Sequence, residues 1–216
     1  MIITCVAHAM FCIELESGTR VVTDPVNGES GYPVQPVQAD IVLVSHHHQD
    51  HDALDSVKGY RYVIDKASPA TELRDIRVTA VRGWHDDALG AKRGESLLFL
   101  VEAEGLRIVH AGDLGTLPSG EQLKALGRVD VLMVPVGGCY TLDADQAQKT
   151  AELLKARVVI PMHYRTSYIE DWPIADEQPF LSLYPEDQVY RQRLLRITAG
   201  DLSVQPRICL LTPRLA

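Results

Sequence analysis

The chain has 216 residues, 46% of them hydrophobic and 23% charged, a globular composition that excludes disordered and fibrous proteins. A formal net charge of -8 without any Lys/Arg run argues against a nucleic-acid partner. No apolar run is long enough to cross a bilayer, and the N-terminus carries no signal peptide, so we expect a cytoplasmic protein with no membrane partner. The four cysteines form no CxxC pair, which predicts free thiols and no cysteine zinc site.

Short apolar and β-branched runs predict a strand-rich first half. In chain order, the predicted strands are residues 2–6, 11–15, 20–23, 41–45, 60–65, 78–81, 96–102 and 107–110. The pair Ser17-Gly18 predicts a hairpin turn between the second and third strands. Residues 27–38 hold two Gly and two Pro and are predicted to form a loop.

The second half of the sequence alternates strands with a helix. Residues 129–134, 158–161, 195–198 and 208–211 predict strands, whereas residues 145–155 have helical spacing. Asp143 is the candidate N-cap of that helix. The basic stretch from Arg191 to Arg196 is typical of a solvated helix face. Strands interspersed with helices predict an α/β fold, and the lack of a linker predicts a single domain over residues 1–216.

A histidine cluster follows the predicted strand 41–45 directly. It contains His46, His48, Asp50 and His51, and imidazole and carboxylate groups are the usual ligands of a borderline metal such as zinc. Because side chains two apart in an extended segment point the same way, His46 and His48 can converge on one ion. Asp50 and His51 come after the turn and can face a second ion. The alternative is an ordinary polar loop or a chance run of histidines.

Three more candidate ligands each follow the end of a predicted strand: His85, Asp113 and His163. Functional residues of α/β folds commonly lie at the carboxyl ends of strands. The seven candidates exceed what one four-coordinate ion requires, so we expect two divalent ions. His110 competes with His85 for one ligand position, because it lies three residues before Asp113.

At these residues the sequence resembles the metallo-β-lactamase superfamily. Its HxHxDH motif is matched by His46, His48, Asp50 and His51, and the early segment AHAMFCIELESGTRVVTDP is similar to the opening strands of the family. The segment HAGDLG resembles a branch of zinc-dependent hydrolases similar to ascorbate-6-phosphate lactonase. The resemblance extends from about His8 to His163 and implies a four-layer αβ/βα sandwich.

The resemblance also implies how the ligands divide. His46, His48 and His85 would hold one ion, and Asp50, His51 and His163 the other. Asp113 and a hydroxide would bridge the two ions. Zinc is the expected metal, with manganese and iron as alternatives. Asp50 is then essential for catalysis, and His110, beside Asp113, becomes a candidate for protonating the leaving group.

The sequence departs from the family in ways that narrow its function. Asp52-Ala53-Leu54 follows the motif where lactamases and thioesterases usually carry Gly-Gly, which argues against both activities. The chain has no room for the domain that nuclease branches insert. We therefore predict a hydrolase whose partner is a small, anionic ester, lactone or phosphodiester. A diiron oxidoreductase on the same fold and a non-enzymatic metal-dependent sensor are the alternatives, and the oligomeric state is not predicted.

Three further polar residues each have two possible roles. His8 either lines the pocket or is a packed histidine at the end of a strand. Asp24 either orients a ligand histidine or is an ordinary turn residue before Pro25. Arg93 either contacts an anionic substrate or is a solvated charge of a loop.

Overall fold

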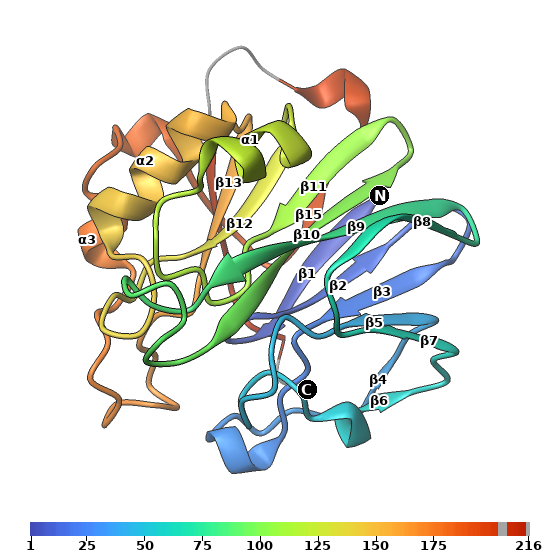
Figure 1. Cartoon of the computed structure of the whole chain (residues 1–216), viewed down its shortest axis with the longest axis horizontal. Coiled ribbons are helices and arrows are strands. Elements are labelled where there is room, and N and C mark those ends of the chain that lie inside the picture. The colour runs from blue at the N-terminus through green and yellow to red at the C-terminus, as the bar shows by residue number, and fades with distance from the viewer. Residues whose placement is uncertain (203–206, 215–216) are drawn as a thin grey trace.

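Two β-sheets packed face to face form the framework of the computed structural model, which describes residues 1–202 and 207–214 (Figure 1). One sheet has six strands, in the spatial order β15 (Leu195–Arg196), β1 (Ile2–Ala7), β2 (Met10–Glu14), β3 (Arg20–Thr23), β5 (Ile41–Leu43) and β7 (Tyr62–Ile64). The other has eight, in the order β14 (Val189–Gln192), β16 (Arg207–Leu211), β13 (Val158–Met162), β12 (Val131–Pro135), β11 (Leu106–His110), β10 (Glu95–Ala103), β9 (Ile76–Trp84) and β8 (Ser68–Leu73). A short ladder joins β4 (Val37–Gln38) and β6 (Val57–Lys58).

Alternating burial along the strands divides the apolar side chains between layers. Phe11 and Ile13 of β2 enter the core between the two sheets, whereas Met10 faces the outer side of the six-stranded sheet. In β12, Val131 and Met133 face the same central core, whereas Leu132 and Val134 face the helices. This is the two-residue period expected of strands whose two faces are both covered.

Three short helices cover the outer face of the eight-stranded sheet (Figure 1): α1 (Gly120–Leu126), α2 (Ala144–Leu154) and α3 (Gln178–Leu181). The predicted N-cap of α2 is confirmed, since the Asp143 side chain accepts a hydrogen bond from the backbone N–H of Gln146 and the Gln146 side chain returns one to Asp143. Ser119 and Gln122 form the same capping box on α1, and the sequence analysis did not find this helix.

The outer face of the six-stranded sheet carries loops and 3₁₀ turns among the described residues. Val26, Tyr32, Ile169 and Ile174 pack there against the outward side chains of the strands. Within residues 1–202 and 207–214, the 3₁₀ turns are η1 (Gly28–Ser30), η2 (Leu54–Ser56), η3 (Glu186–Gln188) and η4 (Ala199–Asp201). The predicted α/β sandwich is confirmed. None of the helices in the described part of the chain is both long and apolar enough to span a membrane.

The main error of the sequence analysis concerns Arg191–Arg196. This stretch is not a helix face, because its residues belong to β14 and β15 and the turn between them. The analysis also missed the strand β8, most of whose side chains are exposed and which therefore lacks the apolar alternation used to find strands. The other predicted strands are confirmed to within a few residues at their ends.

Candidate metal centre

Six strands deliver polar side chains to one edge of the sandwich. In the six-stranded sheet β1, β3 and β5 run in the same direction, and so do β9, β11 and β13 in the eight-stranded sheet. The chain carries a polar residue just past the end of each of these strands: His8, Asp24, His46, His85, Asp113 and His163. The regular sheets thus bring together residues that lie far apart in the sequence.

The loop after β5 separates its histidines as the sequence analysis predicted. His46 is buried and His48 half-buried, whereas the intervening His47 is exposed and lies near Asp52. The loop then turns, because the backbone N–H of His51 donates to the carbonyl of His48 at 2.9 Å. His51 is wholly buried at the centre of the cluster.

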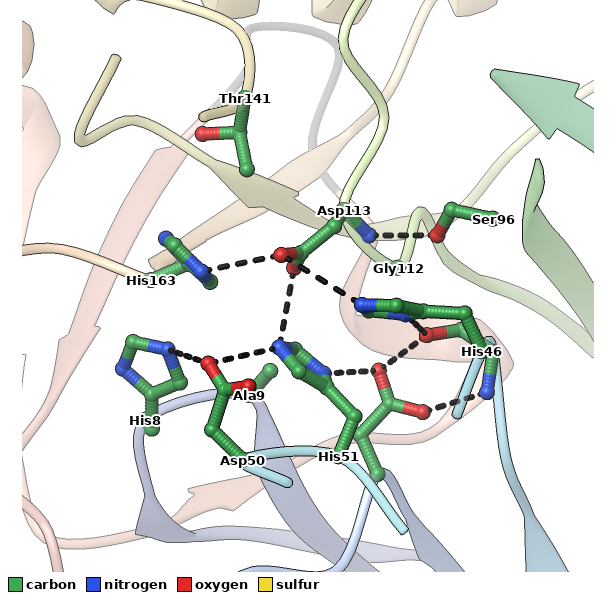
Figure 2. A network of polar contacts seen from close by, with 12 residues as sticks. His8, Ala9, His46, Asp50, His51, Ser96, Gly112, Asp113, Thr141 and His163 are labelled. Atoms are coloured by element: carbon green, nitrogen blue, oxygen red, sulfur yellow. Dashed lines mark hydrogen bonds and ion pairs between the residues drawn. The ribbon is translucent and has the colours of Figure 1, made fainter. Parts of the chain in front are cut away.

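Asp113 lies in the middle of the histidines (Figure 2). Its Oδ2 is 3.0 Å from Nε2 of His163, 3.3 Å from Nε2 of His85 and 3.9 Å from Nε2 of His46. Its Oδ1 is 3.3 Å from Nε2 of His51. A single carboxylate therefore faces four imidazoles at once, which is the arrangement expected of a ligand shared between two ions.

The candidate ligand atoms form groups on either side of Asp113. We call His46, His48 and His85 the first group, and His8, Asp50, His51 and His163 the second group; within each group the ligand atoms lie within 4.8 Å of one another. Buried atoms of both groups have no hydrogen-bond partner, among them Nε2 of His46, Nε2 of His51 and Oδ1 of Asp113. Buried polar atoms are normally paired, so these orphaned nitrogens and oxygens fit divalent metal ions.

Hydrogen bonds at Nδ1 leave Nε2 of several histidines free to bind a metal. Asp24 Oδ2 accepts from the Ser45 hydroxyl at 2.7 Å and lies 2.9 Å from Nδ1 of His51. Ser45 Oγ is in turn 2.9 Å from Nδ1 of His46. In the first group, Nδ1 of His85 donates to the carbonyl of Tyr140 at 3.0 Å. A proton fixed on Nδ1 puts the lone pair on Nε2, where each ring faces Asp113.

His85, not His110, lies in the cluster. Nε2 of His110 donates to the carbonyl of Ala9 at 2.9 Å, and its Nδ1 accepts from the backbone N–H of Gly112 at 3.2 Å. Both ring nitrogens are therefore engaged with the backbone, and the ring is buried. His110 is also absent from the residues that line the cleft beside the cluster.

Burial and neighbouring charges shift the pKa values of the candidate ligands in different directions. Burial lowers the pKa of His46 to about 3 and that of His8 to about 4, so both rings are neutral at pH 7. Burial alone would raise the pKa of Asp113, but His163 and His51 hold it well below its ordinary value. Burial alone would lower the pKa of His51, but Asp113 and Asp24 raise it well above its ordinary value. Imidazoles bind metals as neutral rings and carboxylates as anions, so His46, His8 and Asp113 already have the binding form, whereas His51 would release a proton when an ion binds.

Gly112 allows the loop after β11 to approach the histidine loop closely. Its φ of +51° lies in the left-handed region, and a Cβ there would come within 2.6 Å of Ser96 Oγ and 2.7 Å of Ser45 Cβ. The backbone N–H of the next residue, Asp113, donates to Ser96 Oγ at 2.8 Å. Only glycine fits this contact, which fixes the position of the Asp113 carboxylate.

An open cleft leads from solvent to both ligand groups. It is lined by His48, Gln49, Asp50, His85, Arg93, Asp113, Tyr140, His163, Asp171, Trp172 and Pro173. The guanidinium of Arg93 lies 4.1 Å from the centre of the Tyr140 ring. The loop that carries Arg93 is held by Asp86, whose carboxylate accepts backbone N–H bonds from Ala88, Gly90, Lys92 and Arg93.

Known proteins resemble this chain in both sequence and fold. Residues 2–163 match the family described as the beta-lactamase superfamily domain. A UPF0173 metal-dependent hydrolase of Archaeoglobus fulgidus is 32% identical, with 83% of this chain and 87% of that protein covered. One from Thermococcus kodakarensis is 31% identical, with 80% and 86% covered. A candidate Zn-dependent hydrolase of the metallo-β-lactamase superfamily from Thermotoga maritima, solved by crystallography, is 32% identical and superposes with a TM-score of 0.80 over 97% of both chains.

The paired sheets and the histidine-aspartate cluster at their edge define a metal-binding protein with the metallo-β-lactamase fold. Because the family match spans most of its length, the chain belongs to the beta-lactamase superfamily, among its metal-dependent hydrolases. The resemblance predicted from the HxHxDH motif is therefore confirmed. Its finer likeness to lactonase-like enzymes stays a prediction.

Of the groups that orient the candidate ligands, Asp24 was anticipated from the sequence and lies against His51, whereas the others were missed. Ser45, Ser96 and the carbonyl of Tyr140 carry no sequence signal of their own, because their roles depend on contacts between distant loops. The analysis left His8 with two readings, although its position after β1 repeats the pattern of the other ligands. That repeated position after a strand is the signal that could have identified His8 as a candidate ligand.

Proposed function

We propose that this chain is a hydrolase with two metal ions, most simply zinc, that cleaves a small anionic ester, lactone or phosphodiester. The first group and Asp113 would hold one ion, and Asp50, His51 and His163, again with Asp113, the other. The observation that carries the proposal is the Asp113 carboxylate, which faces histidines of both groups within 3.9 Å. Two divalent cations bound here would lower the pKa of water between them and polarise the bond under attack.

The residues of the cleft supply the rest of the chemistry. Asp50 and His48 are the ligands with most access to solvent, so a substrate can approach the centre from their side. The rings of Tyr140 and Trp172 form apolar walls that limit the water around the substrate. Arg93 stacks on Tyr140 and forms no ion pair with an acidic side chain in the described part of the chain, which leaves its guanidinium available to a carboxylate or phosphate.

His110 has a different role from the one the sequence analysis expected. We propose that it positions residues and does not protonate the leaving group, because both its ring nitrogens hydrogen-bond to the backbone and it lies outside the cleft. Its bonds tie the turn at Ala9 to Gly112, which precedes Asp113. The ring therefore links the loops that carry ligands from the two sheets.

A panel of substrates tests this proposal. The protein is stripped of metal with a chelator, reloaded with zinc, manganese or iron, and assayed with p-nitrophenyl acetate, a simple lactone and bis-p-nitrophenyl phosphate. We expect hydrolysis of at least one ester class only after reloading with two equivalents of metal. Hydrolysis that persists in the metal-free protein would contradict the proposal. Oxygen consumption by the iron-loaded protein without any hydrolysis would favour the oxidoreductase alternative.

A further inference from the structure

His8 occupies a backbone position that suits glycine better than histidine. It is the first of two residues that connect β1 to β2, since Ala7 pairs with Met10 across the hairpin. Its φ is +54°, in the left-handed region. Two-residue hairpin turns with this conformation at their first position usually carry glycine there. A histidine at this position strains the backbone, so its side chain is the feature to explain.

The imidazole of His8 is buried without a hydrogen-bond partner. None of its side-chain surface is exposed, and neither Nδ1 nor Nε2 has a hydrogen-bond partner. The ring centre lies 4.1 Å from that of His163 and 5.3 Å from that of Trp172. Leaving a buried polar group unpaired lowers stability, so a buried ring with no hydrogen-bond partner at either nitrogen points to a bound ion that the protein chain does not itself provide.

The geometry around His8 is that of a four-ligand site. Nε2 of His8 is 3.5 Å from Oδ2 of Asp50, which is also 3.4 Å from Nε2 of His51 (Figure 2). All four ligand atoms of the second group lie within 4.8 Å of one another. A backbone hydrogen bond from His163 to the carbonyl of His8 ties the two ligand loops together. Zinc prefers four ligands in a tetrahedron, and three histidines with one carboxylate meet that preference.

We propose that His8 is a fourth protein ligand of the second ion, beside Asp50, His51 and His163. The inference rests on the proposed two-metal centre and deepens it. The second ion then has a complete ligand set of its own before Asp113 is counted, whereas the first group supplies three histidines. With Asp113 counted for both ions, the first has four protein ligands and the second has five. We therefore expect the second ion to be held more tightly than the first.

Metal titration of His8 variants tests this assignment without any substrate. His8→Gly suits the backbone conformation and His8→Asn tolerates it, so one variant remains available if the other does not fold. Cobalt binding is followed by visible absorption and by competition with a chelator. We expect wild-type protein to bind two ions, and both variants to bind one ion as wild type and the other at least ~100-fold more weakly, beyond the ~10–100-fold cost of losing an outer partner.

A second background identifies which ion is affected. In His85→Ala, the first group is broken and the remaining ion is bound by the second group. Adding His8→Gly to His85→Ala should then weaken this single ion and lower its cobalt absorption, because water replaces a nitrogen ligand. Tyr32→Leu is the matched control, since it removes a buried ring whose centre lies 5.8 Å from that of His8 and which belongs to neither ligand group.

Two results would overturn the assignment. One is that His8→Gly and His8→Asn bind both ions with the affinity and spectrum of wild type. The other is that Tyr32→Leu causes the same loss, which would mean that packing and not ligation is being measured. If wild type binds two ions with His8 dependence but hydrolyses nothing, the proposed function fails and the His8 assignment stands.

Discussion

The two ligand groups of the centre differ in access and in support. The first group borders the cleft, with His48 half-exposed, and hydrogen bonds to Ser45 and Tyr140 orient two of its rings. In the second group three histidines are buried, and Asp24 behind His51 is wholly buried as well. One fold can therefore offer two ions ligand groups that differ in burial and in hydrogen-bond support. Each group has one candidate ligand with access to solvent, His48 in the first and Asp50 in the second, whereas the three buried histidines of the second group anchor the centre to the core.

Asp113→Asn should have the largest effect, because Asp113 is the residue that both groups share. The amide keeps the shape but loses the charge that compensates four imidazoles, so we expect both ions to bind weakly and hydrolysis to fall to the level of the metal-free protein. Metal content by elemental analysis and turnover measure the two effects. Asp52→Asn removes a nearby loop carboxylate outside both groups and serves as the control. Retention of two tightly bound ions in Asp113→Asn would remove the shared ligand from the scheme.

Asp50→Ala and His85→Ala should break the two groups separately. We expect each variant to lose one ion and keep the other, and Asp50→Ala to abolish hydrolysis without unfolding, because Asp50 lies on a partly exposed loop. Circular dichroism checks the fold, and elemental analysis with cobalt spectra shows which ion remains. The spectra of the two variants should differ, since their surviving ions have different ligands. Loss of both ions in either variant would mean that the groups do not bind independently.

Asp24→Asn should cause an intermediate loss. Asp24 accepts hydrogen bonds from Ser45 and from His51, so it orients ligands of both groups through different partners. Outer partners of metal ligands typically contribute ~10–100-fold in affinity or activity. We expect a loss of that size, larger for the second ion because His51 contacts Asp24 directly. Chelator competition measures the affinity for each ion. An equal loss of affinity at both sites would show that the contact from Asp24 through Ser45 to His46 contributes as much as the direct contact with His51.

Arg93→Gln should have the smallest effect, and only on the open side of the centre. An exposed guanidinium that pairs with an anion contributes about 0.2–1 kcal/mol, so we expect KM for anionic substrates to rise about twofold to fivefold. Neutral esters and the affinity for both ions should not change. Arg93→Lys is the matched variant, since it keeps the charge but loses the planar stack on Tyr140. A fall in kcat for neutral esters would place Arg93 in the chemistry and not in substrate binding.

Local pattern was enough to predict much of this centre. The strand 41–45 and the alternating histidines after it appear directly in the sequence, and the candidate ligands His85, Asp113 and His163 could be expected from their positions after strands. The capped helix α2 was found for the same reason, because its Asp143 and Gln146 are neighbours in the chain. These features depend on residues a few positions apart, where spacing determines geometry.

Features that depend on contacts between distant segments could not be predicted. The Ser96 hydroxyl that holds Asp113, and the Tyr140 carbonyl that holds His85, meet their partners only after both sheets have formed. The choice between His85 and His110 had the same limit, since one directly follows a strand of the eight-stranded sheet and the other ends a strand of the same sheet. The structure decides this choice, because the carbonyl of Ala9 accepts a hydrogen bond from His110, which lies 101 positions away in the sequence.

The hairpin turns at the far ends of the strands have a practical consequence. All six site-bearing strands end at one edge, so the β2–β3 turn with Ser17 and the β10–β11 turn with Glu104 lie at the other. These two turns also touch, because the backbone N–H of Glu16 donates to a Glu104 carboxylate oxygen at 2.6 Å. Immobilisation on a support or fusion to a carrier through this pair of turns would hold the enzyme by the edge of the sandwich opposite the metal centre. The mouth of its cleft would then face the surrounding solution.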